Sequence, residues 1–474
     1  MRIRIKASLC RLNAATNVAA LTAGFLLLPA TAGATDIFGI QNVAVDQPII
    51  NALLRPGAGG APLSGIDPLT GDTSFNIQAF FDTGASGVLL SKETADALGV
   101  VHTPGVVFED VGIGGASSFN VSVPLLVDLA PFTPLVNIND ANAYNQRFGP
   151  LRAQINPNDA DFPVDVFGMP AMQNKVVVMD PKPVNTLLAQ MQTYVYSPGT
   201  PFNPGAADSD PGIPHTNRSV GLTFASFSRF TRLTPANAEG PTQNANPFIG
   251  PNPLAKLDPN VPAGTTPGIK LKLGDKETTG SFLLDTGAAA SVISKDVAAK
   301  LGVRERPRLL PDDLPVLEQY DPAHPELPGT ELPNQFVIKL SGTGGDQTAA
   351  GFFLDSMLVR TQQGDAANDD DPRHLRYMGA PVLVADITLQ DPLTLQTLTL
   401  DGLFAMNFLV GSIFVTEPIG LGGDTNPSPY NWIVFDAQHG VLGLDVSAVP
   451  EPASYLVVLL GLGLIGWRLQ RRRR

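Results

Sequence analysis

The sequence predicts a mainly β protein built from two similar lobes, and three observations support this. The chain has 474 residues, more than a single hydrophobic core usually supports. It contains 46 glycines and 43 prolines but only 16% charged residues, which favours strands joined by turns over bundles of helices. A stretch of 21 residues also occurs twice, which predicts one copy in each lobe.

The repeated stretch turns on the tripeptide Asp-Thr-Gly. Residues 80–100, FFDTGASGVLLSKETADALGV, and residues 283–303, LLDTGAAASVISKDVAAKLGV, align without a gap and are identical at 10 of 21 positions. In each copy an apolar strand leads into the aspartate, and the glycine lets the backbone turn sharply. An ionisable side chain at the end of a buried strand is costly to desolvate, so we expect Asp82 and Asp285 to have a function. Symmetric pairing of the lobes would bring these two carboxyl groups face to face.

The first 34 residues have the pattern of a secretory signal peptide. Basic residues precede an apolar stretch, and the small residues Ala32-Gly33-Ala34 predict cleavage before Thr35. The alternative is an uncleaved membrane anchor. Cys10, the single cysteine, lies in this segment, so the predicted mature chain has no thiol, disulfide or cysteine metal ligand.

The last 27 residues, 448–474, have three parts. Val449-Pro450-Glu451-Pro452 precedes an apolar segment at 453–467, and an arginine cluster ends the chain. This tail resembles the PEP-CTERM sorting signal of Gram-negative bacteria, which implies recognition by an exosortase. We therefore expect contact with the membrane only through this short transmembrane segment, before processing. A plain C-terminal membrane anchor is the alternative.

Between the ends, the repeat predicts a first lobe at residues 35–190, a linker at 191–266 and a second lobe at 267–447. The linker is rich in Pro, Asn and Gly, but residues 219–233 alternate like a strand, which is compatible with a hairpin there. The basic residues concentrate at the two ends, so the body is more acidic than the chain's net charge of −13. This acidity argues against nucleic acid as a partner.

Around the two aspartates, the sequence resembles the aspartic proteases, with a local pattern closer to retropepsins than to pepsins. Two apolar residues precede Asp-Thr-Gly-Ala in both copies. A second family element, two apolar residues and a glycine, matches Val166-Phe167-Gly168 and, with alanine in place of glycine, Leu403-Phe404-Ala405. The resemblance implies a bilobal fold of two pseudo-symmetric retropepsin-like β-barrel lobes with a central cleft.

The resemblance also implies the roles of individual residues. Asp82 and Asp285 would be the catalytic pair. The supporting residues would be Thr83, Gly84, Ala85, Thr286, Gly287, Ala288, Gly168 and Ala405. A flap over the cleft would have its tip at Gly112, Ile113, Gly114 and Gly115, although it lacks the tyrosine of pepsin-like enzymes. A further flap from residues 340–351 of the second lobe is compatible with the sequence.

The implied activity is hydrolysis of a peptide or protein substrate by general acid–base catalysis, with neither a metal nor a cofactor. Two carboxyl groups that face each other across a cleft, as the resemblance implies for Asp82 and Asp285, share a proton. The charged group then activates a water molecule. Ala85 and Ala288 stand where pepsin-like enzymes have a hydroxyl. A hydroxyl donor would lower the carboxyl pKa, so its absence predicts a pH optimum less acidic than that of pepsin-like enzymes.

Two alternatives remain at the level of sequence. The chain could be a catalytically weak or inactive surface protein that keeps the fold to bind peptide or polymer, as Ala405 and the tyrosine-free flap suggest. The lobes could also pair between two chains. Elsewhere, the acidic segment with Asp365, Asp369, Asp370 and Asp371 lacks the ligand spacing of a calcium loop, and we interpret it as a solvated loop.

Overall fold

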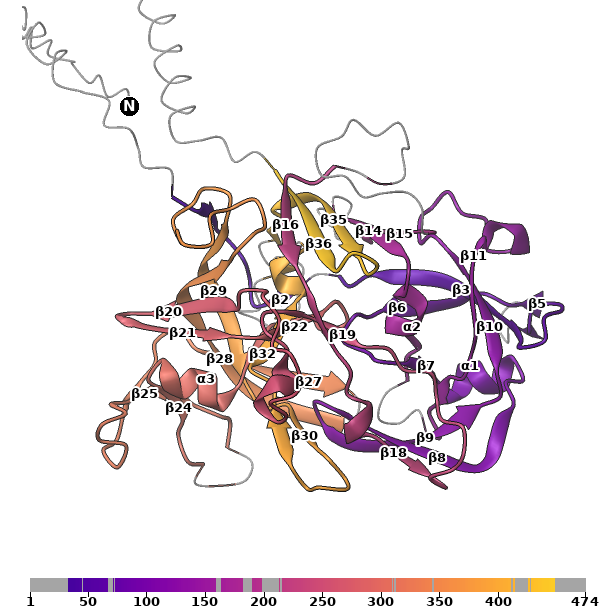
Figure 1. The fold of residues 1–474 in the computed structure, drawn as a ribbon, viewed down its shortest axis with the longest axis horizontal. Coiled ribbons are helices and arrows are strands. Elements are labelled where there is room, and N and C mark those ends of the chain that lie inside the picture. The colour runs from indigo at the N-terminus through magenta and orange to yellow at the C-terminus, as the bar shows by residue number, and fades with distance from the viewer. Residues whose placement is uncertain are drawn as a thin grey trace, which may run out of the picture.

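A computed structural model describes residues 33–447 except residues 45, 67–70, 72, 159–162, 182–189, 198–212, 214, 309, 311–312, 343–344, 411, 414–424 and 427. The protein is mainly β, as predicted, with short helices at α1 (Lys92–Ala97), α2 (Met169–Met172) and α3 (Lys295–Lys300). The first lobe lies on the right of Figure 1 in indigo and magenta, and the second lies on the left in orange. The predicted signal peptide, apart from its last two residues, and the whole sorting tail lie outside the described residues.

The first-lobe sheet contains the strand that leads into Asp82. Its central strands follow the order β6 (Ile77–Phe81), β13 (Val166–Phe167), β7 (Val88–Leu90), β12 (Gln154–Ile155), β9 (Gly115–Ser122) and β8 (His102–Gly112). On the other side of β6 lie β3 (Ile49–Pro56), β10 (Leu125–Ala130) and β11 (Gln146–Leu151).

The second-lobe sheet repeats this arrangement. Its order is β22 (Phe282–Asp285), β32 (Gly402–Ala405), β23 (Val292–Ile293), β29 (Leu375–Val384), β28 (Gly345–Val359) and β27 (Phe336–Gly342). In both sheets the first and third pairings are parallel and the others are antiparallel. The bilobal, pseudo-symmetric class is thus confirmed. Among the described strands the first-lobe sheet is linear and the second-lobe sheet branches at β28 and β29, and neither sheet closes into the predicted barrel.

The helices α1 and α3 occupy the same place in the two repeats, and the sequence explains where each begins. The hydroxyl of Ser91 accepts a hydrogen bond from Thr94 N at 3.1 Å, and that of Ser294 accepts one from Val297 N at 3.2 Å. A side-chain oxygen at this position satisfies a backbone N–H that has no partner within the helix. The shared Ser-Lys dipeptide of the repeat is therefore a helix start.

A five-stranded sheet joins the lobes, at the top of Figure 1. Its order is β15 (Gln192–Tyr196), β14 (Val176–Asp180), β35 (Tyr430–Asp436), β36 (Val441–Val446) and β16 (Arg218–Gly221). The pairing of β14 with β35 brings Val177 of the first lobe opposite Phe435 of the second. Both side chains are buried in the main hydrophobic core, so the two lobes share one apolar interior.

The predicted linker, residues 191–266, contains strands of the three largest sheets. Besides β15 and β16, these are β17 (Thr223–Ala225), β18 (Arg232–Thr234) and β19 (Asn246–Ile249). The strand β17 pairs with β19, β19 pairs with β22 of the second lobe, and β18 pairs with β8 of the first. The strands within residues 219–233 are β16, β17 and the start of β18. Each belongs to a different sheet, and they do not pair with one another.

Smaller elements complete the fold. They are β1 (Thr35–Ile37), β2 (Val43–Ala44), β4 (Gly65–Ile66), β5 (Thr73–Ser74), β20 (Ile269–Leu273), β21 (Lys276–Gly280), β24 (Val303–Glu305), β25 (Leu317–Gln319), β26 (Thr330–Glu331), β30 (Thr388–Gln390), β31 (Thr397–Thr399), β33 (Ser412–Ile413) and β34 (Thr425–Asn426). Within the described part of the chain, no helix is long and apolar enough to cross a membrane. The apolar segment at 453–467 falls outside that part.

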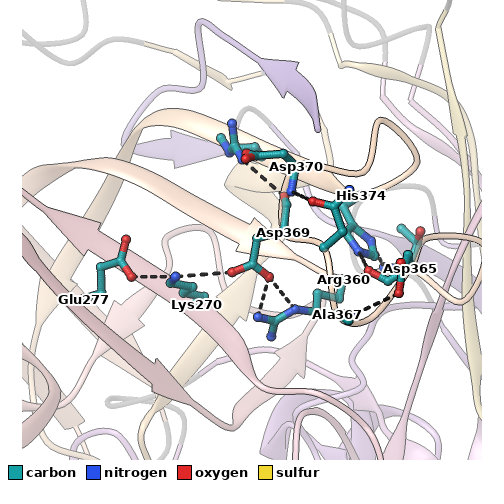
Figure 2. A network of polar contacts seen from close by, with 11 residues as sticks. Lys270, Glu277, Arg360, Asp365, Ala367, Asp369, Asp370 and His374 are labelled. Atoms are coloured by element: carbon teal, nitrogen blue, oxygen red, sulfur yellow. Dashed lines mark hydrogen bonds and ion pairs between the residues drawn. The ribbon is translucent and has the colours of Figure 1, made fainter. Parts of the chain in front are cut away.

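The acidic segment after β28 is held by ion pairs. Asp369 lies between Arg360 and Lys270, at 2.8 Å from the Arg360 Nε atom and 3.2 Å from Lys270 Nζ (Figure 2). Asp370 pairs with Arg376, and Asp371 pairs with Arg373. These carboxylates are therefore neutralised by basic side chains of the same region. Within the described ranges, no three His, Cys, Asp or Glu side chains are grouped as a metal site would require.

Because the five-stranded sheet couples the lobes, a cavity in it should destabilise both. The Phe435 side chain is 1% exposed, and we expect Phe435→Ala to lower the free energy of unfolding by about 3–5 kcal/mol. Urea unfolding followed by far-UV circular dichroism and by tryptophan fluorescence should give one shared transition at a lower midpoint. Two separated transitions would contradict the coupling.

Candidate active site

The two Asp-Thr-Gly loops meet at the boundary between the lobes. The first follows β6 and the second begins at the last residue of β22. The two threonines are 1% and 2% exposed, and their side chains reach into the opposite loop. Thr83 Oγ1 donates to Leu284 O at 2.6 Å, and Thr286 Oγ1 donates to Phe81 O at 2.7 Å. Each hydroxyl also accepts a hydrogen bond from the backbone N–H of the other threonine, at 3.0 and 3.1 Å.

The glycines of the two loops allow the carboxyl groups to approach the opposite backbone. A Cβ atom added at Gly84 would lie 2.6 Å from Asp285 Cγ, and one added at Gly287 would lie 2.4 Å from Asp82 Cγ. Real Cβ atoms do not approach other atoms this closely, so the side chain of any other residue would displace the carboxyl group. Glycine is therefore required here for close approach of the two loops.

The structure brings Asp82 and Asp285 together, with a hydrogen bond between their side chains. Asp82 Oδ1 accepts from Gly84 N at 2.6 Å and from Gly287 N at 3.1 Å, and Ala85 N–H also bonds this carboxyl group. Asp285 Oδ1 accepts from Gly287 N at 3.0 Å and from Ala288 N at 2.9 Å. Backbone donors thus support both carboxylates.

Burial raises the pKa of both aspartates above the ordinary value of 3.8. The rise is larger for Asp285, because the neighbouring charge of Asp82 and the hydrogen bond between the two groups add to the effect of burial. Two carboxyl groups in contact cannot both ionise readily, so the pair holds a proton over a pH range in which a solvated aspartate has lost it.

The loops after β13 and β32 contact the segments that follow the two Asp-Thr-Gly turns in different ways. In the first lobe, Gly168 N donates to Gly87 O at 3.1 Å, and an added Cβ at Gly168 would lie 2.3 Å from that oxygen. In the second lobe, the fully buried Ala405 instead donates its N–H to the Ser291 hydroxyl at 2.9 Å. Ser291, one residue beyond the equivalent of Gly87, therefore takes over the acceptor role. Its hydroxyl bonds Asn407 Oδ1 in turn, so Ala405 is accommodated within a satisfied network.

The predicted flap is the hairpin of β8 and β9, in which Gly112 pairs with Gly115 and Ile113-Gly114 form the turn. The strands β27 and β28 form the equivalent hairpin in the second lobe. The two hairpins approach each other, since a Cβ atom at Gly342 would lie 3.0 Å from Ile113 Cγ2. Val111 of the first hairpin and Leu340 of the second both pack against the same hydrophobic cluster of the second lobe. The hairpin predicted as a flap thus reaches the opposite lobe without a tyrosine.

Sequence reasoning missed Asn246 and Gln47. The buried Asn246 belongs to β19, in the segment predicted as a linker, and its Nδ2 donates to Thr83 O and Gly84 O, both at 3.0 Å. Gln47 Nε2 donates to Gly287 O at 3.3 Å. Both polar side chains precede short apolar runs, PFI after Asn246 and PII after Gln47, that lead into or form strands beside the aspartate strands. That neighbourhood is the only signal that the sequence offers, and it does not reveal the contact.

A cavity of about 440 Å³ lies elsewhere, in the second lobe. Its basic lining residues are Lys295, Arg304, Arg306 and Arg308. These cations already pair with Glu305, Glu318 and Glu331, and the cavity includes neither aspartate.

Comparison with known proteins agrees with this geometry. Residues 269–312, which include the second Asp-Thr-Gly loop, match the family model described as aspartyl protease. The resemblance to aspartic proteases is confirmed. Residues 448–474 match the PEP-CTERM protein-sorting motif, which indicates export and C-terminal sorting. No curated protein matches the chain in a sequence comparison.

Among the solved structures that match this chain are three proteins. The aspartic proteinase from Irpex lacteus is 12% identical, with a TM-score of 0.35, over 87% of this chain and 98% of that one. A protein described as edgp is 10% identical, with a TM-score of 0.30, over 85% and 95%. Basic 7S globulin from soybean is 8% identical, with a TM-score of 0.33, over 85% and 96%.

The threonine contacts should matter for stability. Thr83→Val removes a hydroxyl that both donates and accepts, leaving Leu284 O and Thr286 N without partners. We expect a loss of about 1–3 kcal/mol for each group left unsatisfied. Thr83→Ser, which keeps the hydroxyl, is the matched control and should lose far less in denaturant unfolding. Equal losses in the two variants would show that the methyl group matters more than the hydrogen bonds.

The raised pKa of Asp285 predicts how stability changes with pH. A group whose pKa is higher in the folded protein contributes stability below its unfolded pKa and loses it as pH rises through the folded pKa. Asp285→Asn removes the titrating group and with it this loss of stability. The loss is about 1.4 kcal/mol for each unit by which the folded pKa exceeds the unfolded pKa. The melting temperature of the variant, relative to the native protein, should therefore rise between pH 3 and pH 7. A difference that does not change with pH would refute the assignment.

Proposed function

We propose that this chain is an exported aspartic endopeptidase in which Asp82 and Asp285 activate a water molecule to hydrolyse peptide bonds. The observation that carries this is the contact between two carboxyl groups on loops that are locked to each other by reciprocal hydrogen bonds. Such a pair keeps one proton and one negative charge at the same place, which general acid–base hydrolysis requires. The resemblance confirmed at residues 269–312 supports the same reaction.

The chemistry needs only the two carboxyl groups and water. The charged aspartate takes a proton from water while the water oxygen attacks the peptide carbonyl carbon. The protonated aspartate gives its proton to the carbonyl oxygen. When the C–N bond breaks, the first aspartate returns a proton to the leaving nitrogen, and the second recovers one from the hydroxyl. Gly84, Gly287 and Ala288 hold the carboxyl groups through their N–H groups.

The substrate in this proposal is an extended peptide that lies between the aspartates and the two hairpins β8–β9 and β27–β28. Hairpin edges offer backbone groups to which an extended chain can add as a strand. The tip of the first flap, with Ile113 and three glycines, supplies a mobile backbone there. The absence of a tyrosine at this tip leaves the dyad as the main source of catalytic chemistry.

We also propose the route by which the protein reaches its place of action. Residues 1–34 would be removed as a signal peptide. An exosortase would act on the tail at 448–474, which matches the sorting motif. The protein would then act in the cell envelope, at the cell surface or in the extracellular matrix.

The dyad predicts that either aspartate is indispensable. We expect Asp82→Asn and Asp285→Asn each to reduce cleavage of a mixed peptide library by residues 35–448 by at least about a thousandfold. Asp96→Asn, at a side chain 67% exposed, is the control and should retain full activity.

Cleavage measured from pH 2 to pH 7 should have its optimum above that of pepsin-like enzymes, because no hydroxyl of Ala85 or Ala288 supports the carboxylates. An optimum near about pH 2 would contradict this expectation. If the folded native protein cleaves no peptide, or if cleavage persists unchanged in both variants, the alternative of a scaffold that binds peptide or polymer would be favoured.

A further inference from the structure

The side-chain amides of Asn246 and Gln47 hold equivalent positions in the two lobes. In the first lobe Ile49 of β3 lies opposite Phe80, and in the second Phe248 of β19 lies opposite Leu283. Phe80 and Leu283 are the first residues of the repeat, so Ile49 and Phe248 correspond. Gln47 and Asn246 each lie two residues earlier and therefore correspond as well. Each amide donates across the boundary between the lobes, to the Asp-Thr-Gly glycine carbonyl of the other lobe.

Each of these contacts continues to an aspartate through a peptide group. The carbonyl of Gly287 accepts from Gln47 Nε2, and the N–H of the same peptide group, on Ala288, donates to Asp285 Oδ1 at 2.9 Å. The carbonyl of Gly84 accepts from Asn246 Nδ2, and the N–H of that peptide group, on Ala85, bonds Asp82. Hydrogen bonds linked in this way polarise one another, so a donor at the carbonyl strengthens the N–H as a donor.

The two lobes differ in this contact, because Asn246 donates to two backbone carbonyls and Gln47 donates to one. Its Nδ2 also donates to Thr83 O, and the N–H of that peptide group, on Gly84, donates to Asp82 Oδ1 at 2.6 Å. Both acceptors are backbone carbonyls, so the amide nitrogen must face them, and its oxygen accepts from the Ser86 hydroxyl at 2.8 Å. Asn246 is 1% exposed, whereas Gln47 is only half-buried and makes one contact, at 3.3 Å.

We propose that Asn246 and Gln47 are positioning residues that make the two aspartates unequal, with Asp82 carrying the charge and Asp285 the proton. Asn246 strengthens two of the N–H groups that stabilise the Asp82 carboxylate, and Gln47 strengthens one that faces Asp285. Asp82 therefore takes the proton from water, and Asp285 donates to the substrate carbonyl. This assignment rests on the proposed function, in which symmetry alone would leave the roles interchangeable.

Other ionisable groups near the site have partners of their own. Asp46, next to Gln47, accepts hydrogen bonds from Met191 N and Gln47 N, and Asp110 of the flap accepts from Gln154 Nε2. Asp165, near β7, accepts from Ser91 N and Thr94 Oγ1. Among the described residues, no other charged side chain hydrogen-bonds either member of the dyad.

The test compares Asn246→Leu with Asn244→Ala in the full chain. Asn244 is a matched control, because its side chain bonds Gln173 and its contact with Ser86 uses only its backbone. We expect Asn246→Leu to lower kcat about tenfold with little change in KM and to move the acidic limb of the pH profile to higher pH, because the Asp82 carboxylate loses support. Asn244→Ala should match the native protein.

Gln47→Met provides a second variant at a less buried site. It should move the basic limb to higher pH, because it weakens support of the ionised Asp285, and leave the acidic limb in place. If Asn246→Leu fails to fold, this result decides the question. Profiles that superimpose on that of the native protein would overturn the proposal.

Failure of this inference can be distinguished from failure of the proposed function. If the native protein shows no cleavage that depends on Asp82, the melting temperature measured from pH 3 to pH 7 replaces activity as the readout. Asn246→Leu should then change the pH range over which the native protein loses stability, whereas Asn244→Ala should not. The same pH dependence in all three proteins would overturn the inference.

Discussion

The reciprocal hydrogen bonds between Thr83 and Thr286 are the constraint on which the site depends. Both hydroxyls are buried at the boundary between the lobes, where an unpaired polar group is costly. Each threonine satisfies a carbonyl and an N–H of the opposite loop, so neither loop has its full set of partners without the other. This mutual dependence fixes the distance between the loops, and the two aspartates, one residue before each threonine, are held in contact as a consequence.

Holding two carboxyl groups together is unfavourable, and the surrounding fold has to offset it. The backbone N–H groups of the two loops stabilise the charged form, while burial and mutual repulsion favour retention of a proton. Parallel pairing of β6 with β13 and of β22 with β32 supports each aspartate strand from one side. The second lobe keeps this support despite Ala405, because Ser291 supplies a hydroxyl where the first lobe uses a backbone carbonyl.

The departures from symmetry come mainly from the segment between the repeats. Its strand β18 lies along the outer edge of the first flap, and β19 brings Asn246 against the first Asp-Thr-Gly loop. The position of β19 beside β22 is taken in the first lobe by β3, and Gln47, two residues before β3 begins, makes a weaker contact. The connection thus completes the second sheet and differentiates two loops that are nearly identical in sequence.

The sequence by itself determined the features that are local or repeated. The two Asp-Thr-Gly turns, the helix starts at Ser91 and Ser294 and the mainly β class follow from residue pattern, because each depends on neighbours within a few positions. The sequence also indicated that Asp82 and Asp285 belong together, since a buried strand that ends in a carboxylate needs a use. The boundaries of the lobes were harder to predict, because proline, asparagine and glycine mark turns without showing which strands pair on either side.

Only the tertiary structure decided how residues far apart in the chain share hydrogen bonds. Asn246 lies 162 residues from Gly84, and Gln47 lies 240 residues from Gly287. No periodicity or spacing encodes such contacts, because they depend on the register of β3 and β19 beside the aspartate strands. The same holds for Ser291, whose role appears only when the loop after β32 is seen to approach its hydroxyl and not a backbone carbonyl. Local sequence sets which groups need partners, and the packing of the two lobes determines which partners they find.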